Sequence, residues 1–240
     1  MIDLAKLEYV HDGVTLTGRL ALPKGPGPHP GVLVMHDALG LGDHVYRRSR
    51  MLAELGYAAL AADMYGVGER TPTYEEVGGL FTALQEAPER LRGRVVAAYE
   101  ALRGVAQVDA ARVSAIGFCF GGQCVLELAR SGAAAASVVS FHGLLTTRIP
   151  ARPGEIKAKV LVLTGALDPH APAEVLTAFE TEMTRAGADW QVTLYGNGWH
   201  AFSDPGVASR INSPGIHYDP FIDRLAWAQA TAFLEATLKG

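Results

Sequence analysis

The sequence has few cysteines that could form disulfides and no long apolar stretch that could span a membrane. Only two of its 240 residues are cysteine, Cys119 and Cys124, and they stand too close together for an ordinary structural disulfide. We therefore expect two reduced thiols and a cytoplasmic protein. No apolar stretch approaches the ~20 residues that span a bilayer. The first residues also lack the charged and apolar regions of a signal peptide.

Neither positive nor negative charge is present in large excess. The formal net charge is −4, without a cluster of lysine and arginine, which argues against nucleic acid or an anionic membrane surface as a partner. No metal-ligand spacing such as H-E-x-x-H occurs, so we expect no metal site. With 49% apolar and 19% charged residues, the chain has the composition of an ordinary globular protein. A small molecule is the expected partner, and the sequence leaves open whether the protein is a monomer or a homodimer.

The hydrophobic pattern predicts an α/β fold in one domain, residues 1–240. Residues 7–22 indicate an antiparallel hairpin that turns at Asp12-Gly13, and the apolar run 31–35 indicates a central strand. Beyond this strand we expect helix 46–55, strand 57–62, helix within 74–104, strand 112–117, helix 120–131, strand 135–141, strand 159–165, helix 172–186, strand 190–195 and helix 221–238. Alternation of this kind predicts a mostly parallel sheet with helices on both faces.

Two stretches do not fit regular structure. Residues 64–88 and residues 201–220 are both rich in glycine and proline. Each follows the end of a predicted strand, where α/β folds bind their ligands. Because long irregular segments in a domain are often functional, we expect both to lie near a functional site.

The most informative motif is a G-x-C-x-G pattern formed by Gly117, Cys119 and Gly121. A short β-branched run, 112–116, precedes it, and apolar residues at helical spacing follow it over 120–129. In α/β-hydrolases such a strand–turn–helix junction carries the nucleophile, and only glycine tolerates the crowding two residues to either side. The pattern therefore predicts a thiol nucleophile at Cys119 and a thioester intermediate.

An acid and a base follow in the order typical of that fold. Asp168 and His200 each come after a predicted buried strand, so the chain order is nucleophile, acid, histidine. His200 would take the thiol proton and return it to the leaving group, while Asp168 would orient the imidazole. His170 competes with His200 as the base on paper, but we expect it on the surface.

Two backbone amides complete the predicted machinery. In this fold the oxyanion hole pairs the N–H after the nucleophile with an N–H from the loop after the first central strand. These amides belong to Phe120 and Ala38.

The sequence resembles the dienelactone hydrolase family over nearly its whole length. The matching segments are 36–41 (HDALGL), 61–66 (AADMYG), 117–122 (GFCFGG), 165–168 (GALD) and 200–205 (HAFSDP). The resemblance implies an α/β-hydrolase three-layer sandwich. It also implies a triad of Cys119, His200 and Asp168 that hydrolyses small enol-lactones or related esters without a cofactor.

Two departures from the family pattern concern activation and substrate. Asp37 stands where the family usually has a glutamate that helps to generate the thiolate; it could instead bond the backbone or a nearby arginine. Asp204 replaces an arginine that grips the substrate carboxylate. Arg70, Arg90 or Arg92 could supply that clamp. We expect neutral esters or lactones to be better substrates than dienelactone.

Several residues near the motifs allow two interpretations each. His36 could be a second base or a structural residue at a strand end, and Phe118 could line a substrate pocket or fill the core. His142 could line the pocket or lie in a solvated loop. Cys124 is expected in the core, although a redox-sensing pair with Cys119 is an alternative function. Acyl transfer to an acceptor other than water would use the same chemistry.

Overall fold

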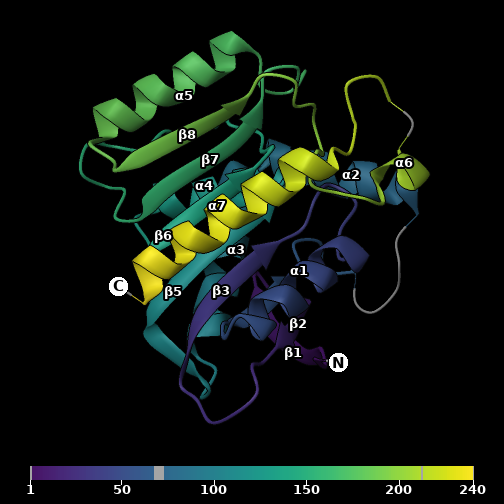
Figure 1. Ribbon diagram of the computed structural model, residues 1–240. Coiled ribbons are helices and arrows are strands. Elements are labelled where there is room, and N and C mark those ends of the chain that lie inside the picture. The colour runs from purple at the N-terminus through teal and green to yellow at the C-terminus, as the bar shows by residue number, and fades with distance from the viewer. Residues whose placement is uncertain (1, 68–72, 212, 240) are drawn as a thin grey trace.

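One twisted sheet of eight strands runs through the protein in the order β1-β2-β4-β3-β5-β6-β7-β8 (Figure 1). The structure is a computed structural model that describes residues 2–67, 73–211 and 213–239. The strands are β1 (Ala5–His11), β2 (Val14–Ala21), β3 (His29–Met35), β4 (Ala58–Ala62), β5 (Val108–Phe118), β6 (Ser137–Phe141), β7 (Lys159–Gly165) and β8 (Trp190–Tyr195). The strands from β4 to β8 in this order pair in parallel, so their carboxyl ends meet at one edge.

The N-terminal hairpin is antiparallel, as the sequence predicts. β1 and β2 pair from Ala5 opposite Leu20 to His11 opposite Val14. Asp12 and Gly13 both have positive φ, at 50° and 73°, which is the conformation of a two-residue type I′ turn. β2 then pairs antiparallel with β4, and this pairing joins the hairpin to the parallel part of the sheet.

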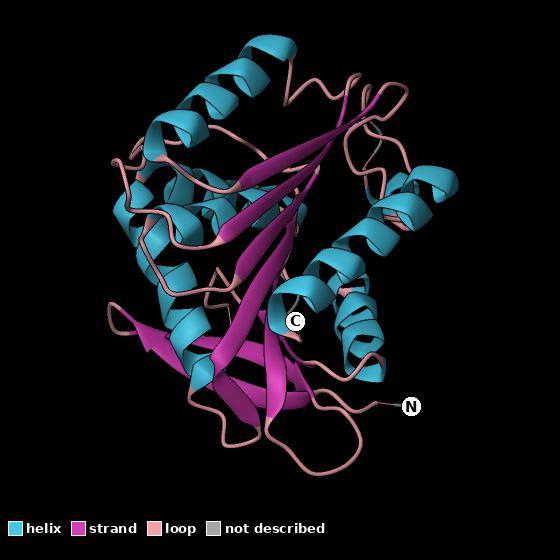
Figure 2. Cartoon of the chain, turned by 60° about the vertical axis from the view of Figure 1, so that its left-hand side comes forward, coloured by secondary structure: helices cyan, strands magenta, loops and turns pink. Residues whose placement is uncertain are grey.

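Helices cover both faces of the sheet (Figure 2). They are α1 (Asp43–Glu54), α2 (Tyr74–Glu86), α3 (Pro88–Arg103), α4 (Phe120–Arg130), α5 (Ala173–Ala186), α6 (Val207–Arg210) and α7 (Pro220–Leu238). One buried apolar cluster joins the sheet to α1 and α7, and a second joins it to α2, α3, α4 and α5. The predicted three-layer α/β-hydrolase sandwich is thereby confirmed.

The largest difference from the predicted elements lies in residues 64–88. This segment was expected to be irregular, yet most of it forms α2. Thr73 caps the helix, because its side chain accepts a hydrogen bond from the Glu76 amide while the Glu76 side chain accepts one from the Thr73 amide. Pro88 then starts α3, so the helix expected within 74–104 is two helices. Proline suits a first helical turn and breaks a helix interior.

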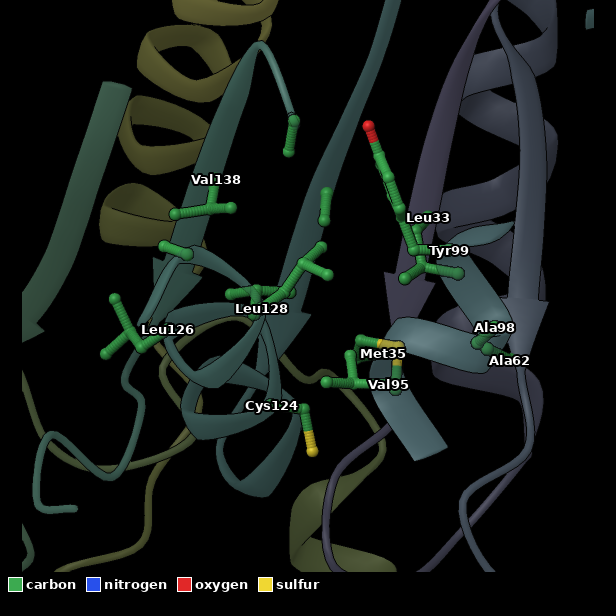
Figure 3. Close-up of a cluster of buried hydrophobic side chains, with 14 of the residues drawn as sticks. Leu33, Met35, Ala62, Val95, Ala98, Tyr99, Cys124, Leu126, Leu128 and Val138 are labelled. Atoms are coloured by element: carbon green, nitrogen blue, oxygen red, sulfur yellow. The ribbon is translucent and has the colours of Figure 1, made fainter. Parts of the chain in front are cut away.

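The core on the α3 and α4 side of the sheet is built mainly from aliphatic side chains (Figure 3). Leu33 of β3 lies beside Tyr99 of α3, and Met35 of β3 lies beside Val95 of α3. Cys124 is 0% exposed in the same cluster, which confirms its predicted core position. The redox alternative therefore lacks a second thiol that solvent can reach.

The helices in the described ranges were compared with the length and hydropathy that a membrane-spanning helix needs. None of them is both long enough and apolar enough to cross a bilayer.

Candidate active site

Cys119 sits on a strained turn between two regular elements. It follows Phe118, the last residue of β5, and precedes Phe120, the first residue of α4. Its φ of 55° and ψ of −115° are costly for a residue with a side chain, and such strain often marks functional sites. The turn is as tight as the sequence predicts: a Cβ on Gly117 would collide with the carbonyl of Gly121.

The second glycine is required for a different reason. A Cβ on Gly121 would collide with the carbonyl oxygens of Met35 and His36, at the end of β3. The first turn of α4 therefore packs directly against the backbone of the neighbouring strand. This close approach brings the sulfur to the carboxyl-terminal edge of the sheet, where loops from several strands meet.

The structure brings Asp168 and His200 together. The His200 Nδ1 atom lies 2.8 Å from Oδ2 of Asp168, and both side chains are buried. The other carboxylate oxygen of Asp168 accepts a hydrogen bond of 2.8 Å from the amide of His170. Because the carboxylate is held on both sides, it fixes the orientation of the imidazole and leaves Nε2 as the ring nitrogen available to Cys119.

His200 also makes a side-chain hydrogen bond with Cys119. Burial alone would lower the pKa of His200. The charge of the Cys119 sulfur and the hydrogen bonds with Asp168 and Cys119 outweigh that effect and raise this pKa to about 10. The imidazole is therefore protonated at neutral pH, with its positive charge beside the sulfur.

His170 contacts the triad without forming part of this hydrogen-bonded chain. Its ring lies edge-on against His200, with 4.6 Å between centroids. His170 is exposed, as the sequence predicts, and it also lines the cavity. Burial lowers its pKa, and the charge of His200 lowers it further, so its imidazole is neutral at pH 7.

Both predicted oxyanion donors belong to residues near Cys119: Phe120 follows it in the chain, and Ala38 lines the same cavity. The amide of Phe120 opens α4, where helix geometry provides no acceptor for it. Within the described part of the chain, the amide of Ala38 also makes no hydrogen bond. Tyr65 holds the Ala38 peptide in place by donating a hydrogen bond of 2.7 Å to its carbonyl.

His36 shapes the loop that carries Ala38. Its Nε2 accepts a hydrogen bond of 3.1 Å from the amide of Met64, so Nδ1 carries the proton and donates to the carbonyl of Asp37 over 2.6 Å. The ring is fully buried. With both nitrogens bonded to backbone, His36 holds the loop and has no nitrogen left for a second base.

The contacts of the Asp37 carboxylate are with its own loop and with an arginine. Its Oδ1 accepts a hydrogen bond of 2.8 Å from the amide of Leu39, and its Oδ2 lies 3.5 Å from Nη1 of Arg210. Between the described residues, no hydrogen bond links Asp37 to Cys119. Asp37, which is shorter than the glutamate usual in the family, thus makes the two contacts that the sequence analysis gave as alternatives, one with the backbone and one with an arginine.

Arg210 is a site residue that the sequence did not predict. It ends α6 and forms an ion pair with Asp204 as well as with Asp37. Asp204, expected as a bare carboxylate that repels anions, therefore has a cationic partner, which it shares with Asp37. The motifs give no signal for Arg210, because it reaches the site only through the path of the 201–220 segment.

Of the arginines that the sequence offered as a carboxylate clamp, the two that the structure describes do not line the cavity. Arg92 forms an ion pair with Glu127, and Arg90 is exposed on α3. Arg70 lies outside the described residues. Phe118 is fully buried beneath the site, with its ring 4.4 Å from that of His44 and 4.9 Å from that of Phe141, and it does not line the cavity.

These groups surround a cavity of about 270 Å³. Its wall is mainly apolar, with side chains from α2, α6 and the loops around them, including Leu39, Phe81, Leu144, Ile211 and Ile216. His142 also lines it and is held by a 2.8 Å contact between its Nε2 and Oγ of Ser203. A cavity of this size accepts a small substrate and leaves Cys119 partly accessible.

One group among the described residues has the composition of a metal site. Ligand atoms of Asp37, His44 and Asp204 all lie within 4.8 Å of one another. Both carboxylates, however, already pair with the guanidinium of Arg210. That cation fills the role that a metal ion would have between them.

Known proteins are similar to this chain in sequence and in fold. The sequence profile of the dienelactone hydrolase family matches residues 16–238. A putative carboxymethylenebutenolidase of Methylorubrum extorquens is 29% identical over 80% of this chain and 69% of its own length. The solved structure designated m3DLH is 36% identical, with a TM-score of 0.91 over 99% of both chains.

A second solved structure is similar to this chain to nearly the same degree in sequence and in fold. It is a dienelactone hydrolase-like promiscuous phosphotriesterase from metagenomic libraries, 35% identical, with a TM-score of 0.90 over 98% of both chains. Since the matches extend over nearly all of the sequence, the protein belongs to the dienelactone hydrolase family and is a carboxylic ester hydrolase.

Proposed function

We propose that the protein hydrolyses small esters or lactones through a Cys119–His200–Asp168 triad and a thioester intermediate. The observation that carries this proposal is the hydrogen-bonded chain from Asp168 through His200 to Cys119 at a cavity. A carboxylate, an imidazole and a nucleophile in this order are the arrangement of triad hydrolases.

Acylation begins with the Cys119 sulfur attacking the substrate carbonyl. The carbonyl oxygen becomes an oxyanion, and the amides of Phe120 and Ala38 donate hydrogen bonds to it. The carbon–oxygen bond to the leaving group then breaks, and His200 Nε2 gives its proton to the departing alkoxide. The products of this step are an alcohol, or a tethered hydroxyl from a lactone, and an acyl thioester on Cys119.

Deacylation uses the same groups in reverse order. The neutral His200 takes a proton from a water molecule while the oxygen of that water attacks the thioester carbonyl. The oxyanion forms again between the same two amides and collapses by expelling the Cys119 thiolate. The acid product leaves, and the thiolate–imidazolium pair is restored without a cofactor.

We further propose that the enzyme prefers neutral substrates to anionic ones such as dienelactone. Asp37 and Asp204 carry two negative charges at the cavity, and Arg210 supplies one positive charge. The group therefore keeps a net charge of about −1, which repels a carboxylate at short range.

The first experiment replaces the nucleophile. Cys119→Ala should reduce the hydrolysis of a neutral aryl ester by at least about 10³-fold, while circular dichroism and the melting temperature show a folded protein. Cys124→Ala is the matched control, since it removes the other thiol from a position in the core. An acyl-enzyme adduct on Cys119, seen by mass spectrometry after rapid quenching, would support the thioester. Full activity of Cys119→Ala would rule the mechanism out.

A second candidate activity is the hydrolysis of neutral phosphotriesters. It is favoured by the 35% identity to the promiscuous phosphotriesterase over nearly the whole chain. The same thiolate could attack phosphorus, and the same two amides could bind the phosphoryl oxygen. Turnover of an aryl dialkyl phosphate that disappears in Cys119→Ala would support this activity, and its absence in the wild type would exclude it.

A further inference from the structure

The turn that follows the catalytic histidine contains a strained residue. Ala201, directly after His200, has a φ of 61°, which is unfavourable for a residue with a side chain. The turn closes with a hydrogen bond of 3.0 Å from the amide of Asp204 to the carbonyl of Ala201. Because such a conformation persists only where the surrounding structure fixes it, the contacts of this turn bear on how precisely His200 is placed.

Backbone hydrogen bonds hold the first part of the turn. The backbone of His200 is hydrogen-bonded on both sides to the segment 215–217. Phe202 is buried in the core, and its carbonyl accepts a hydrogen bond of 3.0 Å from the amide of Asp219. Ser203 is also fully buried, but both of its oxygens are held by side chains. Its hydroxyl lies 2.8 Å from Nε2 of His142, and its carbonyl meets side chains of α1.

Arg48 of α1 provides the charged contact with this carbonyl. Its Nη2 donates a hydrogen bond of 2.9 Å to the carbonyl oxygen of Ser203, and the same nitrogen forms an ion pair with Asp223 of α7. Arg48 is only 1% exposed, and its Cζ lies 4.6 Å from the centroid of the Trp227 ring. One buried side chain thus connects α1, α7 and the turn after His200.

A second side chain of α1 reaches the same carbonyl. The imidazole of His44 also interacts with the backbone of Ser203, and this interaction opposes the effect of burial and of nearby arginines, which lower the pKa of His44. Arg48 brings a full positive charge, and hydrogen bonds from charged donors are stronger than those between neutral groups. Arg48 is therefore the stronger of the two contacts between α1 and the turn.

The ion pair of Arg48 with Asp223 is not needed for packing as such. Taking two charges out of water is costly, and apolar side chains of similar volume often stabilise a core equally well or better. An apolar side chain, however, could not donate a hydrogen bond to Ser203. The directional contact with the turn is what this arginine adds to the core.

The same helix is joined to the other half of the predicted machinery. α1 begins at Asp43, directly after residues 36–42, which we call the oxyanion loop because they include Ala38. Arg48 lies in the second turn of this helix. Its hydrogen bond to Ser203, across 155 residues of the chain, therefore connects the helix that follows the oxyanion loop with the turn that follows the proposed base.

We propose that Arg48 is a positioning residue of the hydrolase, whose hydrogen bond to the Ser203 carbonyl fixes the turn after His200 against α1 and so holds the imidazole beside Cys119. Arg48 is absent from the described residues that line the cavity, so it acts through the turn and does not touch substrate. This inference rests on the proposed function, since it concerns the placement of the proposed base. Misplacing a reacting group by about 1 Å can cost about 10²-fold in rate, so the effect should appear in kcat.

The main variant is Arg48→Met, which keeps an unbranched side chain and removes the donor. For a neutral aryl ester, kcat should fall by at least about tenfold, while KM changes by less than about threefold. The pH profile for an unactivated ester is the second readout. Its upper half-point reflects the pKa of His200, which is about 10 in the wild type. This half-point should move down toward 6.5, the value of an unperturbed histidine, as the imidazole loses its place beside Cys119.

A purely structural role would give a different result. It would lower the melting temperature of Arg48→Met but leave the half-point of the folded enzyme where it was. Arg48→Lys should recover most of kcat and of the half-point, because the three donors of Nζ can serve both Ser203 and Asp223. A lysine variant that recovers neither readout would count against the proposal.

A second variant allows for the charge that Arg48→Met leaves unpaired in the core, since an unpaired buried carboxylate is strongly destabilising. Arg48→Met/Asp223→Leu removes both charges and replaces them with apolar side chains. It also lacks the donor to Ser203. The double variant should therefore show the same fall in kcat and the same shift of the half-point in a folded protein.

Asp223→Asn is the matched control. It removes the charge that pairs with Arg48, but it keeps the donor to Ser203 and an amide oxygen that accepts from the guanidinium. We expect a loss of stability in denaturant titration, with kcat and the half-point close to those of the wild type. The control separates the ion pair from the hydrogen bond to the turn.

The proposal is overturned if a folded Arg48→Met or double variant keeps the kcat and the half-point of the wild type. It is also overturned if Asp223→Asn loses as much activity as Arg48→Met. Failure of the proposed function is seen separately, as Cys119→Ala that still hydrolyses the ester.

The wild-type protein gives a check that does not depend on a folded variant. Nuclear magnetic resonance can detect scalar coupling through a hydrogen bond, here between Nη2 of Arg48 and the carbonyl carbon of Ser203. We expect this coupling once the Nη2 resonance is resolved. Its absence would contradict the contact on which the proposal depends.

Discussion

The floor and the wall of the cavity are built in different ways. The floor consists of Cys119, Asp168, His200 and the two predicted oxyanion amides, all of which follow the ends of parallel strands. The wall comes from α2, α6 and connecting loops, and Arg210 there is partly exposed. In the mechanism proposed above, the reacting atoms therefore depend on the sheet, whereas the choice of substrate depends on the segments that cross over it.

The largest effect should come from the floor. Asp168→Asn removes the charge that holds the His200 imidazole and can present an amide donor to Nδ1, which favours the wrong tautomer. We expect a loss of about 10³-fold or more in kcat, with KM changed much less. Steady-state kinetics on a neutral aryl ester measures both. A loss smaller than tenfold would mean that the floor does not work as one unit.

A second change tests how rigid the floor is. Gly121→Ala places a methyl group against the carbonyl oxygens of Met35 and His36, which are backbone atoms of the neighbouring strand end and cannot move aside alone. We expect a loss of about 1–3 kcal/mol in the free energy of unfolding and a large fall in activity, measured by denaturant titration and ester hydrolysis.

Gly79→Ala provides the contrast on the wall side. Gly79 lies within α2, and a Cβ there meets nothing within 4 Å. Alanine is the better helix former, so the same substitution should stabilise the protein by up to about 1 kcal/mol. If Gly79→Ala lowered the free energy of unfolding as much as Gly121→Ala does, the floor would be no more tightly packed than the wall.

Arg210→Ala should act on the wall and chiefly on substrate choice. Without the guanidinium, Asp37 and Asp204 lose their shared cation, and anionic substrates meet a stronger repulsion. We expect the ratio of kcat/KM for a neutral ester to that for a carboxylate-bearing ester to rise by about tenfold at low salt. The rise should shrink as ionic strength increases, because exposed charges are screened. Arg210→Lys should restore much of the original ratio, and an unchanged ratio in Arg210→Ala would remove this residue from substrate selection.

The smallest expected effect is a pH dependence that belongs to the floor. The pKa of His200 is raised to about 10, so the imidazolium that protonates the leaving group is present below that pH and is lost above it. The kcat/KM profile for an unactivated ester should therefore stay level through pH 9 and fall to half near pH 10. A half-point near 6.5, the value of an unperturbed histidine, would show that Cys119 and His200 do not form the ion pair.

The floor could be predicted from the sequence because its signals are local. The glycines around Cys119, and the positions of Asp168 and His200 after apolar strands, are imposed by sterics and by strand order, and both can be recognised within a few residues. The predicted sheet, hairpin and helices follow from hydrophobic periodicity for the same reason. The capping box at Thr73 and the break at Pro88 were also local signals, which would have identified α2.

The wall could not be predicted in the same way. Arg210 meets Asp37 only because the long segment after His200 folds back over the oxyanion loop. His44 belongs to a helix with no catalytic motif, and it faces the cavity through the packing of its ring on Phe118. Contacts between residues so distant in the chain depend on loop paths, which neither periodicity nor spacing encodes.

The unequal accessibility of the two cysteines has a practical consequence. Cys124 is sealed in the core, while Cys119 is open to the cavity. In the folded protein, therefore, a thiol reagent reports on one sulfur alone, and the amount of label incorporated counts competent enzyme molecules directly. A fluorophore or spin label can accordingly be attached at a single, known position of the natural sequence without first engineering out the other cysteine.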